Sequence, residues 1–350
     1  MQIVIATSSA GHGPVAAARN LARAIATSSR GSADVSVIDL PRQLGAMADL
    51  TVNRLYNFSL RHGLLWNRIG VGLSFRLDWT RLGRWMTASS GAEIPGLRGD
   101  VVVFTTPWLV EQALDGLDPG ATTHAVVLDL GPPLSPGWGC AGISRVHAPT
   151  PDARDALDGR ADILGVPVFP PTMDRHEAAC TRCDGAPSLL MMGGRSGYAG
   201  LPSLLRAFAR KSGLHITVLA GTDPAFRGAL ERIASRAQAH VVVRTFVADV
   251  SPLFATHDVV LSKPGTMTIG EALAHGKPLL LDGSGGLMPQ EVGNARFVER
   301  SGAGLLIHSP ASVPPGLERV LEDASYARAA RSLTALAGVE RIAAAILRDA

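Results

Sequence analysis

The chain has 350 residues, of which 46% are hydrophobic and 18% are charged, and its formal net charge is +3. This length exceeds the usual size of a single hydrophobic core, so two domains are expected. Three cysteines are too few for a disulfide-stabilised scaffold, and the small net charge gives no reason to expect a nucleic-acid partner.

The chain begins with MQIVIATSSAG, which is predicted to be a strand followed by a turn. No basic region precedes its apolar stretch, and the stretch is too short for a signal peptide. No uncharged segment reaches the roughly 18 apolar residues that a membrane-spanning helix needs. We therefore expect a cytoplasmic protein.

Short apolar segments alternate with amphipathic segments along most of the chain. Their lack of polar alternation predicts parallel sheets that are covered by helices on both faces. The patterns 14–26 and 201–210 are typical of these helices. The predicted strands are residues 3–6, 34–39, 101–104, 124–130, 145–148, 189–192, 215–220, 240–246, 258–262 and 278–282.

The first glycine-rich turn is TSSAGHG, residues 7–13, between a predicted strand and a predicted helix. Pro14 at the first helical position is a helix-start signal. The turn places His12 at the carboxyl end of the strand, where an imidazole that titrates near neutrality suits a general base. The alternative is a turn histidine that only caps a backbone group. The turn does not match G-x-G-x-x-G, which argues against a nicotinamide enzyme.

Arginine and tryptophan are concentrated in residues 54–86. This segment contains six arginines against one acid, Asp78, and three of the five tryptophans. Arg54, Arg61 and Arg68 recur every seven residues, on one face of a helix. Such a composition predicts a segment that lies on an anionic membrane surface. The alternative is a pair of helices packed inside the first domain.

Residues 166–187 interrupt the series with prolines and charges, and they are predicted to be a linker between domains. The linker contains Cys180 and Cys183, a C-x-x-C pair without a second pair, for which a structural role is favoured over a metal or redox site. Residues 310–350 are predicted to be helical, and a terminal helix in such an enzyme can return to the first domain.

The second glycine-rich turn is MMGGRSGYAG, residues 191–200. Successive glycines let backbone N–H groups approach an anion, and the start of the following helix adds its dipole. The turn lacks the Gly-Lys-Ser ending of a nucleoside-triphosphatase loop. A tight turn without a ligand is the alternative.

The third turn is SKPGTMTIGE, residues 262–271. Thr266 and Thr268 are placed to cap a helix, and Glu271 follows about one turn later. A carboxylate that points into a cleft there suits two vicinal hydroxyls, each donating to one oxygen. After the next strand, Gln290, Glu291 and Asn294 form a compact polar set matched to sugar hydroxyls, with a solvated helix face as the alternative.

These motifs carry a specific resemblance. DVVLSKPGTMTIGEALAHGKPLLL and PQEVGNARFVERSGAG resemble the donor-binding signature of GT-B glycosyltransferases. Within these, the chain resembles the group of monogalactosyldiacylglycerol synthases, diacylglycerol glucosyltransferases and the lipid II N-acetylglucosaminyltransferase. SSAGHGPVAAARNLARAI, GDVVVFTTPWLVEQAL and HAVVLDLGPPLSPGW are similar to the first-domain elements of this group. The resemblance therefore extends over most of the chain.

The resemblance implies roles for individual residues. Glu271 would bind the ribose of a UDP-sugar, and Phe246 and Val247 would bracket the uracil, mainly through backbone groups. Gln290, Glu291 and Asn294 would hold the transferred sugar. The candidate catalytic bases are His12 and Asp129. The groups that would approach the phosphates belong to Gly193, Gly194, Ser196, Gly197, Thr266, Met267 and Thr268.

The chain also departs from the group's pattern. The usual Lys-Pro-Gly-Gly is Lys-Pro-Gly-Thr here, so Thr266 adds a side chain beside the expected phosphate site. The element around Asp129 lacks its usual preceding threonine and the histidine before its tryptophan, and Pro132, Pro133 and Pro136 stiffen the loop. The acceptor side is therefore the part of the site that the resemblance defines least.

The expected fold is α/β, with two Rossmann-like domains (1–165 and 188–350) facing across a cleft. The expected function is inverting transfer of a hexose from a UDP-sugar to a lipid acceptor of diacylglycerol or polyprenyl type, at the inner face of the cell membrane. Because no Asp-x-Asp is present, we expect neither a metal nor another cofactor. The alternatives are a soluble glycosyltransferase acting on a small aglycone, a UDP-sugar epimerase, and a non-catalytic nucleotide-sugar binding protein.

Overall fold

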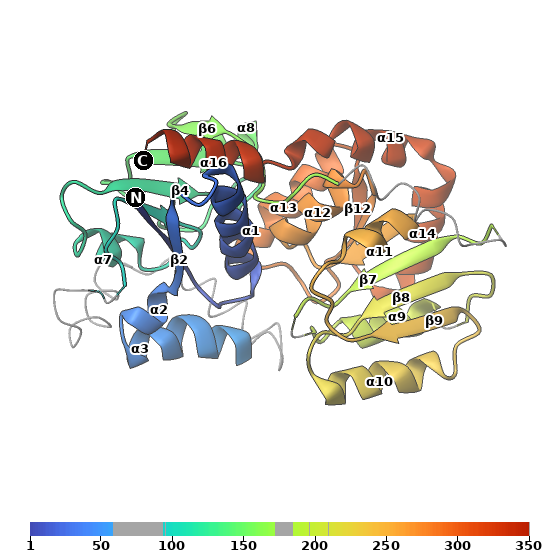
Figure 1. The fold of residues 1–350 in the computed structure, drawn as a ribbon. Coiled ribbons are helices and arrows are strands. Elements are labelled where there is room, and N and C mark those ends of the chain that lie inside the picture. Colours follow the sequence, from blue (N-terminus) through green and yellow to red (C-terminus); the bar gives the residue numbers. More distant parts are fainter. Residues whose placement is uncertain (59–93, 95, 172–184, 196, 209, 350) are drawn as a thin grey trace.

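The computed structural model describes residues 1–58, 94, 96–171, 185–195, 197–208 and 210–349. It contains two α/β domains, each built on a six-stranded parallel sheet (Figure 1). The predicted fold class, two Rossmann-like domains, is confirmed.

The first sheet has the strand order β2-β1-β3-β4-β5-β6. Its strands are β1 Gln2–Thr7, β2 Asp34–Asp39, β3 Val101–Phe104, β4 Thr122–Val126, β5 Arg145–Ala148 and β6 Ala161–Ile163. The edge strand β2 exposes Val37, unlike the buried central strand β3. β4 ends four residues before the predicted end. Leu128 and Leu130 are apolar because they are buried in a loop whose apolar cluster includes residues of the second domain.

The second sheet has the strand order β12-β11-β10-β7-β8-β9. Its strands are β7 Ser188–Met192, β8 His215–Leu219, β9 His240–Arg244, β10 Val259–Ser262, β11 Leu279–Asp282 and β12 Gly304–Ile307. The strand order reverses at the first strand of each domain, β1 and β7. Ligands of doubly wound folds bind at the carboxyl ends of the strands beside such a reversal. Strands β6 and β12 were not predicted.

Helices cover both sheets. In the first domain they are α1 Gly13–Ser28, α2 Leu40–Gln43, α3 Ala46–Ala48, the π-helix η1 Asp49–Leu55, α7 Val110–Leu114 and α8 Pro151–Asp155. In the second they are α9 Leu201–Phe208, α10 Pro224–Ala234, α11 Ser251–Thr256, α12 Thr266–Ala274, α13 Pro289–Arg300, α14 Val313–Glu322 and α15 Ala324–Ser332, with 3-10 helices η3 Pro310–Ser312 and η4 Thr334–Leu336. Helix α1 buries Ala17, Leu21, Ala24 and Ile25, a spacing that places one apolar stripe against the sheet.

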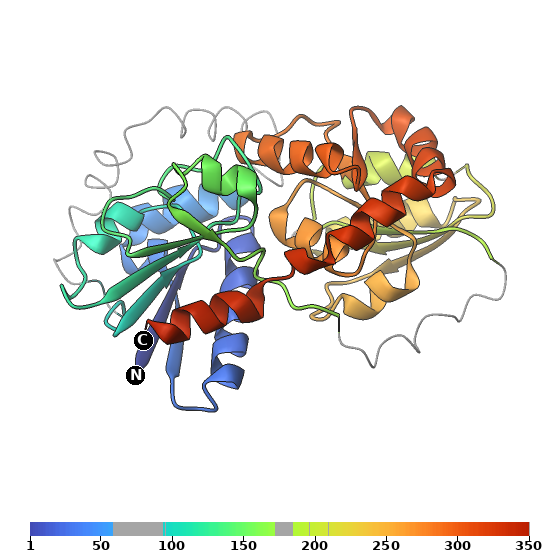
Figure 2. The ribbon, with the colours of Figure 1, turned by 90° about the horizontal axis from the view of Figure 1, so that it is seen from above.

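The last helix, α16 Val339–Arg348, returns to the first domain and packs on α1 (Figure 2). Beside this crossing, the Val166 amide donates to the Leu336 carbonyl at 2.8 Å, and the Gly338 amide donates to the Val166 carbonyl at 2.8 Å. The start of the predicted linker is therefore buried between the domains. The segment predicted as the second domain supplies a helix to the first.

Two predicted features lie wholly or mostly outside the described residues: Cys180 with Cys183, and most of the segment 54–86. Within the part of the chain that is described, no helix combines the length and apolar character needed to cross a membrane.

Candidate functional site

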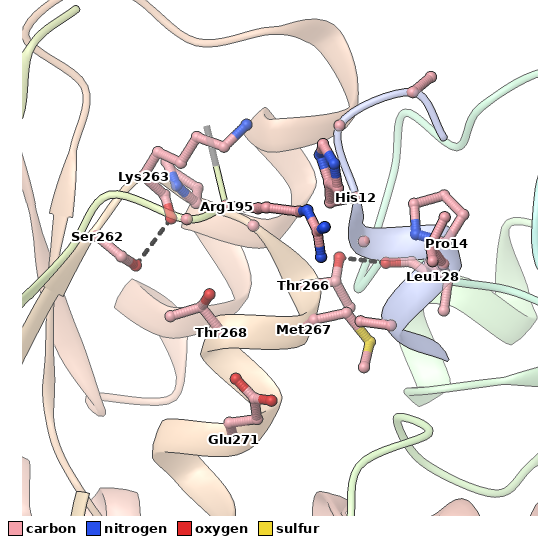
Figure 3. A pocket seen from close by; sticks show the side chains of 18 of the residues that line it. His12, Pro14, Leu128, Arg195, Ser262, Lys263, Thr266, Met267, Thr268 and Glu271 are labelled. Atoms are coloured by element: carbon pink, nitrogen blue, oxygen red, sulfur yellow. Dashed lines mark hydrogen bonds between the residues drawn. The ribbon is translucent and has the colours of Figure 1, made fainter. Parts of the chain in front are cut away.

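A cavity of about 390 Å³ is lined by residues that follow strands of both sheets. Its walls bring together loops of the first domain and the starts of α12 and α13 in the second (Figure 3). The predicted site residues that line it are His12, Asp129, Gly194, Phe246, Val247, Thr266, Met267, Thr268, Glu271, Gln290, Glu291 and Asn294.

The start of α12 forms one wall of the cavity. Its N-cap is Gly265, and no side chain caps the helix. The first backbone hydrogen bond is from the Ile269 amide to the Gly265 carbonyl, at 3.0 Å, so the preceding amides have no partner within the helix. The predicted capping by Thr266 and Thr268 is wrong, because the Thr266 hydroxyl donates to the Leu128 carbonyl of the other domain. The uncapped helix start presents positive potential to the cavity.

Glu271 lies one turn further along α12, with its carboxylate directed along the cavity (Figure 3). Burial raises the pKa of this carboxyl to about 7, and the negative charge of Asp249 adds to the shift. Hydrogen bonds donated by a ligand would stabilise the ionised carboxylate, which burial disfavours. The side chain is therefore suited to a ligand that brings hydroxyl donors.

The glycines of the turn after β7 were predicted to approach the phosphates, but they do not all line the cavity. Gly194 lines the cavity, whereas Gly193 and Gly197 are not among its lining residues. The Gly193 amide donates to the Leu219 carbonyl at 3.0 Å, so it is not available to a phosphate. Gly197 has φ of 71°, and a Cβ there would lie 2.6 Å from Phe226. These two glycines shape the turn, and Ser196 lies outside the described residues.

Three cations that were not among the predicted site residues line the cavity: Arg19, Arg195 and Lys263. The Arg195 guanidinium lies 5.1 Å from the centroid of the Phe246 ring, and Figure 3 shows it below the imidazole of His12 and directed toward Thr266. Lys263 Nζ lies 3.4 Å from Glu291 Oε1. A basic residue inside the glycine-rich turn was a signal in the sequence for Arg195, because such turns approach anions.

The start of α13 supplies three predicted sugar-binding side chains with different surroundings. The Oε1 atom of Gln290 is buried and has no hydrogen-bond partner within the described part of the chain. Glu291 accepts a hydrogen bond from the Met288 amide at 3.1 Å, which fixes the start of the helix. Both amide hydrogens of Asn294 are donated within the protein, to the Pro264 carbonyl and the Thr266 hydroxyl. Gln290 is therefore the member of the set with an unused acceptor.

Asp129 lies in the loop after β4 and is only 5% exposed. Its Oδ2 atom accepts hydrogen bonds from the Ser135 amide at 2.6 Å and from Trp138 Nε1 at 2.8 Å. Burial raises the pKa of this carboxyl, and the two hydrogen bonds offset part of the shift. A carboxylate that is fixed in place, with a pKa above its ordinary value, has the properties of a general base.

His12 is the N-cap residue of α1, with a left-handed φ of 67°. This conformation is uncommon for a residue other than glycine, and it directs the imidazole into the cavity (Figure 3). Asn57 holds the turn, because its Oδ1 accepts from the Gly11 amide at 3.0 Å and its Nδ2 donates to the Ser9 carbonyl at 2.9 Å. No local pattern predicted this contact, which spans more than 40 residues.

Tyr56, beside Asn57, also lines the cavity and was not predicted. Gln290 Nε2 donates to its hydroxyl at 3.5 Å, so the two domains meet here across the cavity. Among the described residues, no group of three or more His, Cys, Asp or Glu could hold a metal ion. The expected absence of a metal stays a prediction.

No protein-family model matches the chain. It is 26% identical over 340 residues to a probable monogalactosyldiacylglycerol synthase 2 from Oryza sativa subsp. japonica, covering 88% of this chain and 71% of that protein. It is also 28% identical over 142 residues to a processive diacylglycerol beta-glucosyltransferase from Bacillus cereus, covering 40% of this chain and 36% of that protein.

Among solved structures, the chain is similar to MurG from Acinetobacter baumannii, with a TM-score of 0.60, 14% identity and 99% coverage of both chains. It is also similar to UDP-GlcNAc 2-epimerase from Neisseria meningitidis bound to UDP-GlcNAc, with a TM-score of 0.57, 13% identity and full coverage of both chains. At these identities the structures show the fold, and the sequence relatives point to the activity. The chain therefore has the two-domain fold of these proteins, and its sequence is similar to that of monogalactosyldiacylglycerol synthases.

Proposed function

We propose that this protein transfers a hexose from a UDP-sugar to a hydroxyl of a lipid acceptor, with inversion at the anomeric carbon. The observation that carries the proposal is that one cavity contains Glu271, the uncapped start of α12 and Asp129. These groups suit a ribose, a diphosphate and an acceptor hydroxyl, respectively. The names of the relatives, which include a diacylglycerol glucosyltransferase, support a lipid acceptor.

The donor occupies the second-domain wall in this proposal. Glu271 accepts hydrogen bonds from both ribose hydroxyls, and the amides at the start of α12 receive the diphosphate. Arg195 and Lys263 add positive charge beside them. The Phe246 ring is 40% exposed at the cavity, which suits stacking on uracil. Its amide already donates to the Gly221 carbonyl at 2.9 Å, so backbone contacts to the base fall to its carbonyl and to Val247.

The chemical step is a single displacement. The acceptor oxygen forms a bond to the anomeric carbon, the bond from that carbon to the UDP oxygen breaks, and the acceptor proton moves to Asp129. The charge on the leaving diphosphate is stabilised by the α12 amides, Arg195 and Lys263. Because the base belongs to the first domain and the leaving group to the second, attack and departure occur on opposite faces of the sugar. This arrangement supports inversion.

The acceptor is proposed to reach the site from a membrane surface. The described residues before the masked part of segment 54–86 expose apolar side chains, with Leu55 54% and Phe58 59% exposed. The exposed Arg42 and Arg54 lie in the same region of the chain. Exposed apolar groups beside arginines suit binding to anionic lipid. We therefore propose a cytoplasmic protein that binds the inner face of the cell membrane.

The decisive experiment measures UDP release from several UDP-sugars with diacylglycerol in anionic vesicles, and identifies the products by mass spectrometry. The expected product is a glycolipid whose anomeric configuration is opposite to that of the donor. Equal turnover of a water-soluble aglycone, without vesicle binding, would favour a soluble glycosyltransferase. Conversion of the UDP-sugar to an epimer without any acceptor would favour an epimerase, a class that shares this fold.

A further inference from the structure

Two side chains at the base of the cavity connect the domains on either side of Asp129. The Thr266 hydroxyl donates to the carbonyl of Leu128. Asn294 Oδ1 accepts from the amide of Leu130 at 2.8 Å. The two side chains also bond to each other, with 3.0 Å between Asn294 Nδ2 and Thr266 Oγ1. The backbone groups immediately before and after Asp129 are therefore both held by the second domain.

The backbone groups in this network, which can only donate or only accept, fix the direction of each of its hydrogen bonds. The amide of Leu130 can only donate, so it must face Asn294 Oδ1. The Pro264 carbonyl can only accept, and it lies 2.9 Å from Asn294 Nδ2. The second Nδ2 hydrogen is then directed to Thr266 Oγ1, which leaves the Thr266 hydrogen for the Leu128 carbonyl. Because each donor meets an acceptor, the network has one consistent arrangement.

The network is buried at a point where the two domains meet backbone to backbone. Thr266 is 9% exposed and Asn294 is 3% exposed. A Cβ atom added to Gly293 would lie 1.9 Å from the Gly131 carbonyl oxygen, so the loop after Asp129 rests directly on α13. A polar group that is buried in such a place without a partner is destabilising, and the network therefore favours this interdomain arrangement.

We propose that Thr266 and Asn294 form an interdomain clasp, and that they are positioning residues which set the place of Asp129 relative to the bound donor. The clasp fixes the backbone of Asp129 from the second domain, while Ser135 and Trp138 fix its carboxylate from the first. The inference rests on the proposed role of Asp129 as the base. It gives Asn294 a role in holding the two domains in their relative positions rather than in binding the transferred sugar.

The departure from the resembled pattern supports this role. A glycine at position 266, as in Lys-Pro-Gly-Gly, has no hydroxyl to give to Leu128 and none to receive the Asn294 amide. The backbone amide at this position is the same with either residue. The threonine therefore adds an interdomain bond without removing an amide from the expected phosphate site.

The test compares the variants Thr266→Val, Thr266→Ser, Asn294→Ala and Arg300→Met in the full chain. Valine keeps the shape of threonine without the hydroxyl, and serine keeps the hydroxyl. Arg300→Met is the control, because it removes another interdomain contact, the Arg300–Asp152 ion pair at 2.9 Å at the last residue of α13, which does not belong to the Thr266–Asn294 network. Two quantities are measured for each protein: hydrogen exchange of the Leu130 amide without ligand, and kcat and KM for the UDP-sugar.

We expect Thr266→Val and Asn294→Ala to lower kcat about tenfold or more, with KM for the UDP-sugar within about twofold of wild type. The double variant should lower kcat by less than the product of the two single-variant factors, because the two side chains belong to one network. Exchange of the Leu130 amide should be about fivefold faster in both single variants. Thr266→Ser should keep kcat and the slow exchange of the Leu130 amide close to wild type. Arg300→Met should change neither quantity.

Three kinetic results and one exchange result would overturn the proposal. One is an unchanged kcat in Thr266→Val. Another is an Asn294→Ala variant that raises KM with kcat unchanged, which would return Asn294 to the sugar. The third is an Arg300→Met variant as impaired as Thr266→Val, which would indicate general loosening of the domains. If wild type has no transferase activity, the proposed function fails separately, and unchanged Leu130 exchange in Asn294→Ala would still overturn the clasp.

Discussion

The two walls of the cavity are built in different ways. The second-domain wall presents its groups from the starts of α12 and α13, within a few residues of the strands that precede them. The first-domain wall presents His12 and Asp129 from loops that are held by Asn57, Trp138 and residues of the other domain. The difference teaches that the proposed donor site is built from local segments of the chain, whereas the place of the proposed base depends on contacts between distant segments.

The largest expected effect is on the first-domain wall. Asp129→Asn removes the proposed proton acceptor, and we expect kcat to fall about 10³-fold, since a positioned general base contributes about 10²–10⁴-fold. The affinity for UDP, measured by calorimetry, should stay within about twofold of wild type, because UDP binds the other wall. His12→Ala should have a smaller effect on kcat. The reverse order of the two variants would transfer the role of base to His12.

The next effect concerns charge on the second-domain wall. Arg195→Met removes a cation beside the expected diphosphate, and we expect kcat to fall about 10²-fold, the scale on which one stabilising donor acts. Arg195→Lys should recover part of the loss, because the charge returns without the fork of the guanidinium. Steady-state kinetics with a saturating acceptor measures both. Normal turnover in Arg195→Met would place this arginine outside the reaction.

Glu271 is expected to make the binding of UDP depend on pH. Burial holds the pKa of this carboxyl at about 7 in the free protein, so it is ionised above that pH and protonated below it. Hydrogen bonds from ribose favour the ionised form, so UDP affinity should be constant above about pH 7 and fall about tenfold per pH unit below it. Glu271→Gln should bind UDP about tenfold more weakly, without this dependence. Calorimetry between about pH 5.5 and about pH 8 checks both expectations.

The smallest effect tests the proposed membrane face of the first domain. Leu55→Asn should weaken binding to anionic vesicles about fivefold, because it removes apolar area that would leave water at the membrane. The matched control is Val37→Asn, at another exposed apolar side chain of the same domain, on the edge strand β2. Vesicle sedimentation measures both variants. Equal loss in the two would show that position 55 has no special part in the contact.

Local patterns predicted much of this protein. Short apolar runs predicted ten of the twelve strands in the described residues, and for central strands such as β3 the reason is that a strand buried on both faces needs apolar residues at consecutive positions. Strand β6 has only three residues, whereas β12 is as long as the predicted strand β3 and was missed although Leu305, Leu306 and Ile307 are apolar. The predicted extension of β4 through Leu130 failed, since burial between domains selects the same residues as burial within a sheet.

The site divides in the same way. The sequence by itself determined the fold class, the turn that begins α12 and the place of Glu271 one turn later, because these depend on spacing within a few residues. Only the tertiary structure decided that Thr266 and Asn294 join the domains, that Gly193 uses its amide internally, and that Tyr56 faces Gln290. These hydrogen bonds depend on how segments that are distant in the sequence are placed in space, and no local periodicity of the sequence predicts that placement.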